Sequence, residues 1–217
     1  AGIISTLCVF CIRRYFLQEN VSGVLEVKRM PLIVLPKGIL LLIAIIALCS
    51  RVTEGSFTNW STIYMKTIVE FPENLVPLGL TIYAAFMSIG RFIGDTIRKR
   101  YSDPVILLGS CVMTTVGIFT IVVDTDFIFA ALGFFITGLG ISCLVPIIYT
   151  LAGNQKEVSP GVGIAMVNTV SSTAFLFGPF LIGRIAEGYS MRIAYCYVLG
   201  LTILMTILTH QLVRRKR

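Results

Sequence analysis

The sequence predicts an all-α integral membrane protein, and three observations support this prediction. Hydrophobic residues make up 56% of the 217 residues and charged residues only 13%, whereas soluble proteins average about 45–50% and about 25%. The mean hydropathy is +0.89. The apolar residues also fall into long blocks, and a block of about 20 is the length of a helix that crosses a bilayer. This composition excludes a secreted disulfide scaffold and a cytosolic enzyme.

The N-terminal region has two parts. Residues 1–12 are apolar but stop at Arg13-Arg14, and they lack the charged start and small-residue cleavage site of a signal peptide. We interpret them as the end of a preceding transmembrane helix. Residues 13–37 are polar and basic and contain two prolines, so they are predicted to form a cytoplasmic loop.

Residues 38–213 are predicted to form a five-helix transmembrane bundle, followed by a basic cytoplasmic tail at 214–217. Pro146 and Pro179 lie inside this bundle and are tolerable because neighbouring helices can satisfy the freed carbonyls. Six apolar stretches can be delimited in this region, one more than the five helices assigned to it, and they run over 38–65, 75–97, 104–123, 127–151, 162–186 and 193–213.

The orientation follows from the basic residues. Thirteen of the 18 lysines and arginines fall in alternate loops and at the C-terminus, two fall on the opposite side, and three lie within the spans. The positive-inside rule places the thirteen in the cytoplasm, so the C-terminus is expected there. The net charge of +7 is thereby explained by topology and by contact with anionic lipid headgroups, and we expect no nucleic-acid partner.

Motifs for metal or cofactor chemistry are weak. Cys8-x-x-Cys11 has the spacing of a redox or zinc pair, but zinc takes four ligands and His210 is the only histidine. The cysteines are therefore interpreted as packing residues. No phosphate-binding loop or nucleophile motif is present in the sequence, so no catalytic residue, metal or cofactor is expected.

Ionisable residues inside the spans are the candidate functional residues, because each costs about 2.5–3.5 kcal/mol at a helix centre. Arg51 and Glu54 are three residues apart and can pair on one helical face. They are either a neutral pair that fixes helix packing or the lining of a water-filled path that binds substrate or a proton. The predicted substrate or proton pathway consists of Arg51, Glu54, Tyr83 and Asn168.

The stretch Gly90-Arg91-Phe92-Ile93-Gly94-Asp95 precedes a basic run at residues 98–100. It resembles the cytoplasmic loop motif of the major facilitator superfamily, in which glycine and aspartate are followed by basic residues in a short loop. The stretch from Glu54-Gly55 to Trp60-Ser61 resembles a pattern of the sugar-permease-like (fucose-permease-like) branch, and Gly178-Pro179-Phe180-Leu181-Ile182-Gly183 is also typical of the family.

This resemblance covers essentially the whole chain, as the C-terminal six-helix half of a twelve-helix transporter with its first helix truncated. It implies secondary active transport of a small solute by alternating access, coupled to a proton or another ion. The implied partners are a small-molecule substrate, the N-terminal half of the same transporter and membrane lipids, in a bacterial inner membrane. Tyr101-Ser102 departs from the family's loop glycine, and the N-terminal copy of the motif is missing.

Two other classes of function remain open. A non-transporting scaffold or sensor could use the same fold to bind a partner. A membrane-embedded enzyme is disfavoured because few His, Asp or Glu residues lie within the spans.

A cytoplasmic gate is predicted at Arg91, Asp95 and Arg98. Asp95 lies within about one turn of both arginines. The span that begins after Pro160-Gly161 starts at the same membrane face, with unpaired amide groups. A carboxylate near such a helix start gains about 0.3–1 kcal/mol, so we expect Asp95 to lie near it.

Overall fold

A computed structural model describes residues 36–155 and 158–216 of the chain. These residues form helices joined by short loops, and no strand occurs among them. The helices are α2 (Ile39–Thr67), α3 (Leu78–Arg98), α4 (Asp103–Val123), α5 (Phe127–Ser142), α6 (Leu144–Gly153), α7 (Pro160–Gly188) and α8 (Met191–Lys216).

One helical rod is broken within the membrane region. α5 and α6 together cover Phe127–Gly153, but the helix is interrupted at Cys143. Pro146 accounts for this break, because proline has no N–H to bond the carbonyl four residues before it and its ring crowds that turn. Pro179 lies inside α7 without ending it.

The described residues contain six rods when α5 and α6 are counted as one, one more than the five helices expected between 38 and 213. Five rods are long and apolar enough to cross a membrane, and α3 is the sixth. Arg91 and Asp95 lower the hydropathy of α3.

Three of the predicted segments can be compared with the described residues only in part. The expected helix end at residues 1–12 lies outside them, as does the expected cytoplasmic loop apart from residues 36 and 37. The predicted tail at 214–217 is the end of a helix as far as Lys216, since α8 continues to that residue.

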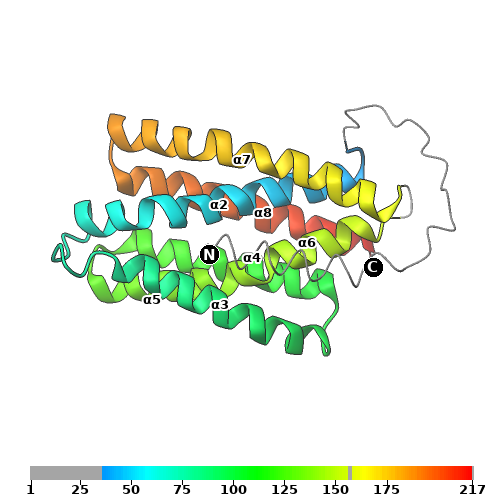
Figure 1. Cartoon of the computed structure of the whole chain (residues 1–217), viewed down its shortest axis with the longest axis horizontal. Coiled ribbons are helices and arrows are strands. Elements are labelled where there is room, and N and C mark those ends of the chain that lie inside the picture. The colour runs from blue at the N-terminus through cyan, green and yellow to red at the C-terminus, as the bar shows by residue number, and fades with distance from the viewer. Residues whose placement is uncertain (1–35, 156–157, 217) are drawn as a thin grey trace, which may run out of the picture. The chain divides into compact units, whose positions relative to one another are not determined.

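The helices pack around α2 and α5. α2 packs mainly against α7 and α8, whereas α5 packs against α3 and α4 (Figure 1). Phe57 of α2 lies at the centre, with ring centroids 5.0 Å from Tyr83, 5.5 Å from Phe134 and 5.6 Å from Tyr195. Four helices thus meet at one aromatic cluster.

Glycines allow close contact between α3 and the end of α5. A Cβ atom at Gly94 would stand 2.6 Å from the Cys143 sulfur, and one at Gly138 would stand 2.6 Å from the carbonyl oxygen of Tyr83. Any larger residue would separate these helices. Gly90 and Gly94, one turn apart on α3, both face the end of α5, as small residues at contacts between membrane helices do.

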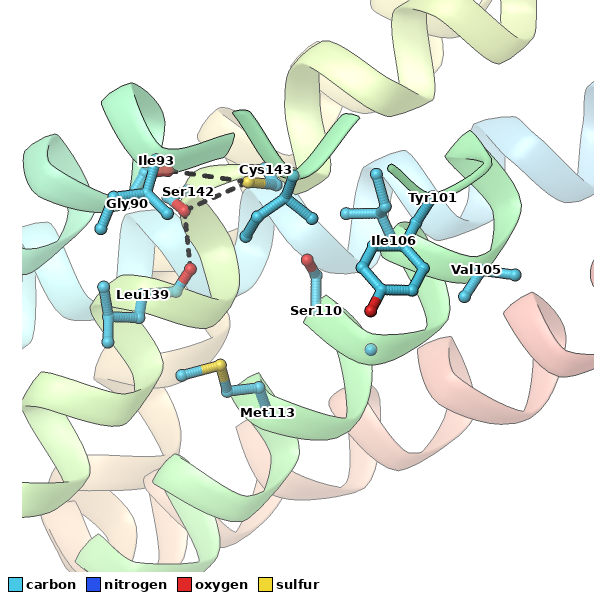
Figure 2. A pocket seen from close by; sticks show the side chains of 12 residues that line it. Gly90, Ile93, Tyr101, Val105, Ile106, Ser110, Met113, Leu139, Ser142 and Cys143 are labelled. Atoms are coloured by element: carbon cyan, nitrogen blue, oxygen red, sulfur yellow. Dashed lines mark hydrogen bonds between the residues drawn. The ribbon is translucent and has the colours of Figure 1, made fainter. Parts of the chain in front are cut away.

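An apolar crevice lies where α3 and α4 diverge near the loop that joins them (Figure 2). Its volume is about 480 Å³, and the last turns of α3, the first turns of α4 and the end of α5 line it. Ile93, Ile97 and Val105, all more than a third exposed, are among the lining residues.

Candidate functional site

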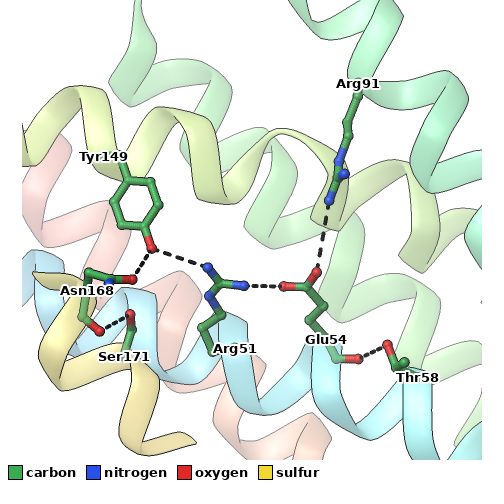
Figure 3. Close-up of polar contacts among 7 residues, drawn as sticks. All are labelled: Arg51, Glu54, Thr58, Arg91, Tyr149, Asn168 and Ser171. Atoms are coloured by element: carbon green, nitrogen blue, oxygen red, sulfur yellow. Dashed lines mark hydrogen bonds and ion pairs between the residues drawn. The ribbon is translucent and has the colours of Figure 1, made fainter. Parts of the chain in front are cut away.

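A chain of polar contacts connects four helices at the middle of the bundle (Figure 3). The Tyr149 hydroxyl donates a hydrogen bond to Asn168 Oδ1 at 2.7 Å and accepts one from Arg51 Nη2 at 3.2 Å. Arg51 Nη1 lies 3.3 Å from Glu54 Oε2, and Arg91 Nη2 lies 4.0 Å from Glu54 Oε1. The five residues come from α7, α6, α2 and α3.

Local structure explains how these side chains meet. Arg51 and Glu54 lie one turn apart near the midpoint of α2, and residues three apart on a helix are neighbours on its surface. Tyr149 lies in α6, after the break at Cys143. Interrupted helices at membrane depth are typical of the binding sites of secondary transporters.

The charges of these five contacting side chains do not cancel. Two guanidinium groups face one carboxylate, which leaves a single net positive charge. The side chains of Arg51 and Glu54 are 22% and 18% exposed, whereas that of Arg91 is 57% exposed. The Arg51 guanidinium also lies 5.4 Å from the centre of the Phe175 ring, a favourable cation–π distance. Arg91 is therefore the group best able to bind another anion.

The surface around these five contacting side chains is polar. Thr58 and Asn59 of α2 are exposed, as are Asn168, Thr169 and Ser172 of α7. Polar groups are costly against lipid, so such a surface within membrane-spanning helices indicates contact with water or with other protein. The site is therefore open on the side formed by α2 and α7.

Of the four predicted pathway residues, the structure brings Arg51, Glu54 and Asn168 together and places Tyr83 apart from them. Tyr83 is only 2% exposed and stacks on Phe57 in the aromatic core. Its hydroxyl has no hydrogen-bond partner among the described residues. The sequence prediction put Tyr83 in the pathway, whereas the structure packs its ring with the core.

The three predicted gate residues have different environments. Arg98 Nε lies 3.1 Å from Asp103 Oδ1 at the start of α4, and Arg98 Nη2 lies 3.1 Å from the Thr150 hydroxyl of α6. It thus ties together the ends of three helices. Arg91 faces Glu54 in the polar chain. Asp95 is exposed and forms no ion pair within 4 Å with any described residue.

The expected position of Asp95 near the start of α7 is wrong. Throughout their described lengths, α3 and α7 do not touch, and they lie on opposite sides of the bundle in Figure 1. Asp95 instead lines a small cleft between α3 and α6 with Arg91 and Arg98. The two helix ends share a membrane face without being neighbours, because α2 and α6 lie between them.

Sequence reasoning missed Tyr149, Thr150 and Asp103, which all take part in these contacts. Tyr149 links Arg51 to Asn168, and its position three residues after Pro146 was the available signal, since broken helices surround transporter sites. For Asp103 the available signal was its place in the first turn of a helix, where the helix dipole stabilises an acidic residue.

Metal binding finds no support within residues 36–155 and 158–216, where no cluster of three or more His, Cys, Asp or Glu could hold an ion. Cys49, Cys111 and Cys143 are buried free thiols, whereas Cys196 is exposed. Cys8 and Cys11 lie outside the described residues.

Comparison with known proteins identifies the family. The model of the Major Facilitator Superfamily matches residues 43–217. An uncharacterised MFS-type transporter of Yersinia pestis is 30% identical over 165 residues, which is 76% of this chain and 43% of that protein. Membrane protein MosC of Rhizobium meliloti is 28% identical over 166 residues, which is 76% of this chain and 41% of that protein. The chain therefore spans about two fifths of these relatives.

Solved structures share the fold. The POT family transporter PepTSo superimposes with a TM-score of 0.73 at 16% identity, covering 84% of this chain and 38% of that one. A peptide transporter POT in complex with sulfate gives a TM-score of 0.71 at 13% identity, covering 79% of this chain and 37% of that one. The assignment to the sugar-permease-like branch stays a prediction. The family match over residues 43–217, the transporter relatives and the shared six-helix fold together show that this chain belongs to the major facilitator superfamily.

Proposed function

We propose that the protein is a secondary active transporter of a small solute, which works by alternating access and couples transport to a proton. In this proposal the chain forms one six-helix wall of the transport path, and the N-terminal half of the same transporter forms the other. The observation that carries the proposal is the ionic chain Arg51–Glu54–Arg91, which lies at the middle of α2 on an open polar surface.

The geometry suggests how coupling would work. The Glu54 carboxylate lies between two guanidinium groups, at 3.3 Å and 4.0 Å. An anionic group of the substrate would compete with Glu54 for these arginines, most easily at the exposed Arg91. A carboxylate that loses its cationic partners loses the attraction that stabilises its charged form. Substrate binding and proton uptake at Glu54 would therefore favour one another.

The gate in this proposal lies at the ends of α3, α4 and α6. Arg98 would hold these ends together through Asp103 and Thr150. The exposed carboxylate of Asp95 would be available to a partner in the other half when this side of the transporter closes. Arg91 would connect the gate to the site, because it lines the same small cleft as Asp95 and also faces Glu54.

Replacement of Glu54 tests the coupling role in the full-length transporter. Glu54→Gln keeps the size of the side chain but cannot carry a proton. We expect uphill accumulation to be abolished, while exchange of labelled substrate across the membrane is retained. The measurement is uptake with and without a proton gradient over a panel of sugars, amino acids and organic anions.

Glu187→Gln is the matched control, because Glu187 lies exposed at the end of α7 with Arg184 as its partner. Unimpaired accumulation by Glu54→Gln would rule out a coupling role. Loss of both accumulation and exchange in a folded protein would assign Glu54 to substrate binding instead.

The orientation proposed from the basic residues places the C-terminus and the α3–α4 loop in the cytoplasm. Single cysteines at Lys99 and Asp126, both exposed, lie at opposite ends of the bundle. A membrane-impermeant thiol reagent should label position 126 from outside intact cells, and position 99 only after the cells are opened. Labelling of position 99 from outside would reverse the topology.

A further inference from the structure

We propose that the apolar crevice between α3 and α4 is a binding site for one anionic phospholipid. An acyl chain would occupy the crevice, and the headgroup phosphate would bind Lys99 and Arg100 at its mouth. This inference concerns a different face of α3 from the one that carries the transport site, and it does not depend on the proposed coupling mechanism.

The crevice has the size and chemistry of a ligand site. Its volume of about 480 Å³ lies within the range of about 300–1,000 Å³ that is usual for small-molecule pockets. Gly109, Met113 and Leu139 are among its lining residues, and neither an acidic nor a basic side chain lines it. Water would find few hydrogen-bond partners there, whereas a hydrocarbon chain would replace lost van der Waals contacts.

The crevice is separated from the transport site by α3 itself. Ile93 and Ile97 line the crevice, whereas Arg91, Asp95 and Arg98 line the small cleft towards α6. The substrate path proposed above therefore lies on the opposite flank of this helix. The crevice is flanked by exposed apolar side chains of α4 such as Val105 and Val112, as expected for a surface that meets lipid tails.

The position of the crevice explains why the lipid would be anionic. Its lining residues belong to the last turns of α3 and the first turns of α4, so its mouth lies at the loop that joins them, at the level of the headgroups. Lys99 and Arg100 in this loop are exposed, and no carboxylate of the described residues lies within 4 Å of either. Of the two acidic residues nearest along the chain, Asp103 is paired with Arg98, and Asp95 lines the cleft towards α6 rather than the crevice.

An aromatic side chain completes the mouth. Tyr101 is 57% exposed and lines the crevice, and Figure 2 shows its ring beside Ile106 and Val105. Tyrosine favours the membrane interface because its ring is apolar and its hydroxyl can reach water or a headgroup. Basic residues beside a gap between transmembrane helices are a recurring site for anionic lipid headgroups.

Lipid retention by the purified full-length transporter tests the proposal. The delipidated protein is incubated with palmitoyl-oleoyl phosphatidylglycerol or with palmitoyl-oleoyl phosphatidylcholine, and native mass spectrometry measures the fraction that retains one lipid. We expect the anionic lipid to be retained at least about fivefold better, since each nearby lysine or arginine contributes about that factor. Equal retention of the two lipids would overturn the proposed headgroup contact.

Two variants locate the acyl chain and the headgroup. Gly109→Leu should fill the crevice without displacing other atoms, because a Cβ at Gly109 meets nothing within 4 Å. It should reduce retention of both lipids about tenfold. Gly200→Leu on α8 is the matched control, since Gly200 is equally unobstructed and does not line the crevice. Lys99→Gln with Arg100→Gln should remove only the preference for phosphatidylglycerol, whereas Arg214→Gln at the end of α8 should not.

A cross-linking experiment on the unmodified protein keeps the test independent of how the variants fold. Phosphatidylglycerol with a photoreactive group in its acyl chain should label peptides within residues 90–113 or 139–143, which line the crevice. Wild-type retention by Gly109→Leu, or labelling confined to other peptides, would show that the lipid does not occupy this crevice.

Discussion

The exposed side chains of α4 and α8 differ from those at the centre of α2 and in the first half of α7, whereas the second half of α7 again exposes apolar residues such as Phe177 and Phe180. Along α4 and α8 the exposed residues are mainly aliphatic or aromatic, as at Val116, Phe119 and Ile203. α2 exposes Thr58 and Asn59 near its centre, and the exposed polar residues of α7 are Asn168, Thr169, Ser172 and Thr173. Exposed residues therefore have two kinds of surroundings in this fold: an apolar surface suits lipid tails, and a polar surface suits water or other protein.

The role of α3 is to separate these two surfaces. Its apolar residues Ile93 and Ile97 lie toward α4, and its charged residues lie toward α6. Both the proposed lipid site and the proposed gate therefore depend on the same helix.

The largest expected effect comes from placing a charge on each surface. Val116 and Ser172 both lie about three and a half turns into their helices, and both are exposed. Val116→Lys should cost about 2.5–3.5 kcal/mol, because its ammonium group would face hydrocarbon. Ser172→Lys should cost much less, because its surface is polar. The measurements are the amount of folded full-length protein in membranes and its thermal midpoint, with Val116→Leu as a control. Equal losses in the two lysine variants would contradict the comparison.

A smaller effect is expected from the charge at the end of α3. Asp95→Asn keeps the size of the side chain and removes its charge. If the carboxylate finds a partner only when this side of the transporter closes, a loss of about 1.4 kcal/mol would shift the ratio of the two states tenfold. We expect normal insertion, turnover lower by about tenfold, and faster thiol labelling of positions in the path from the cytoplasmic side.

Asp126→Asn, at the opposite end of the bundle, is the control for Asp95 and should transport normally. Unchanged turnover and unchanged labelling in Asp95→Asn would show that Asp95 does not act in the gate.

The smallest effect is expected at the centre of the polar chain. Tyr149→Phe removes the hydroxyl that joins Arg51 to Asn168, and a hydrogen bond of this kind contributes about 1 kcal/mol net. We expect the KM for uptake to rise about fivefold at unchanged protein level. Tyr197→Phe on α8 is the control, since its hydroxyl forms no hydrogen bond with the described residues. An equal KM in both variants would show that the Tyr149 hydroxyl does not contribute to substrate binding.

Much of the fold could be predicted from the sequence, because hydropathy in a membrane protein reports directly on which segments span. The apolar stretches agree with the helices to within a few residues, as at 104–123 against Asp103–Val123. The number of rods was underestimated by one, and the break at Cys143 was not foreseen. A proline within a span is compatible with both a broken and a continuous helix, as Pro146 and Pro179 show.

The candidate site could be predicted only in part. Arg51 and Glu54 were found because an ionisable residue at membrane depth is costly wherever it points. Tyr149 and Tyr83 could not be told apart, since a tyrosine is compatible with both core and cavity and only its neighbours decide between them. The structure packs Tyr83 against Phe57 and bonds Tyr149 to Arg51.

The sequence by itself determined that this protein is a bundle of membrane-spanning helices, that charged residues lie inside them, and which ends carry the basic residues. These properties depend on composition along one helix at a time. Only the tertiary structure decided which helices are neighbours: Arg91 faces Glu54, Arg98 pairs with Asp103, and Asp95 lies far from the start of α7. Contacts between helices depend on close packing at positions such as Gly94 and Gly138, and the hydropathy of a single segment does not encode the partner against which it packs.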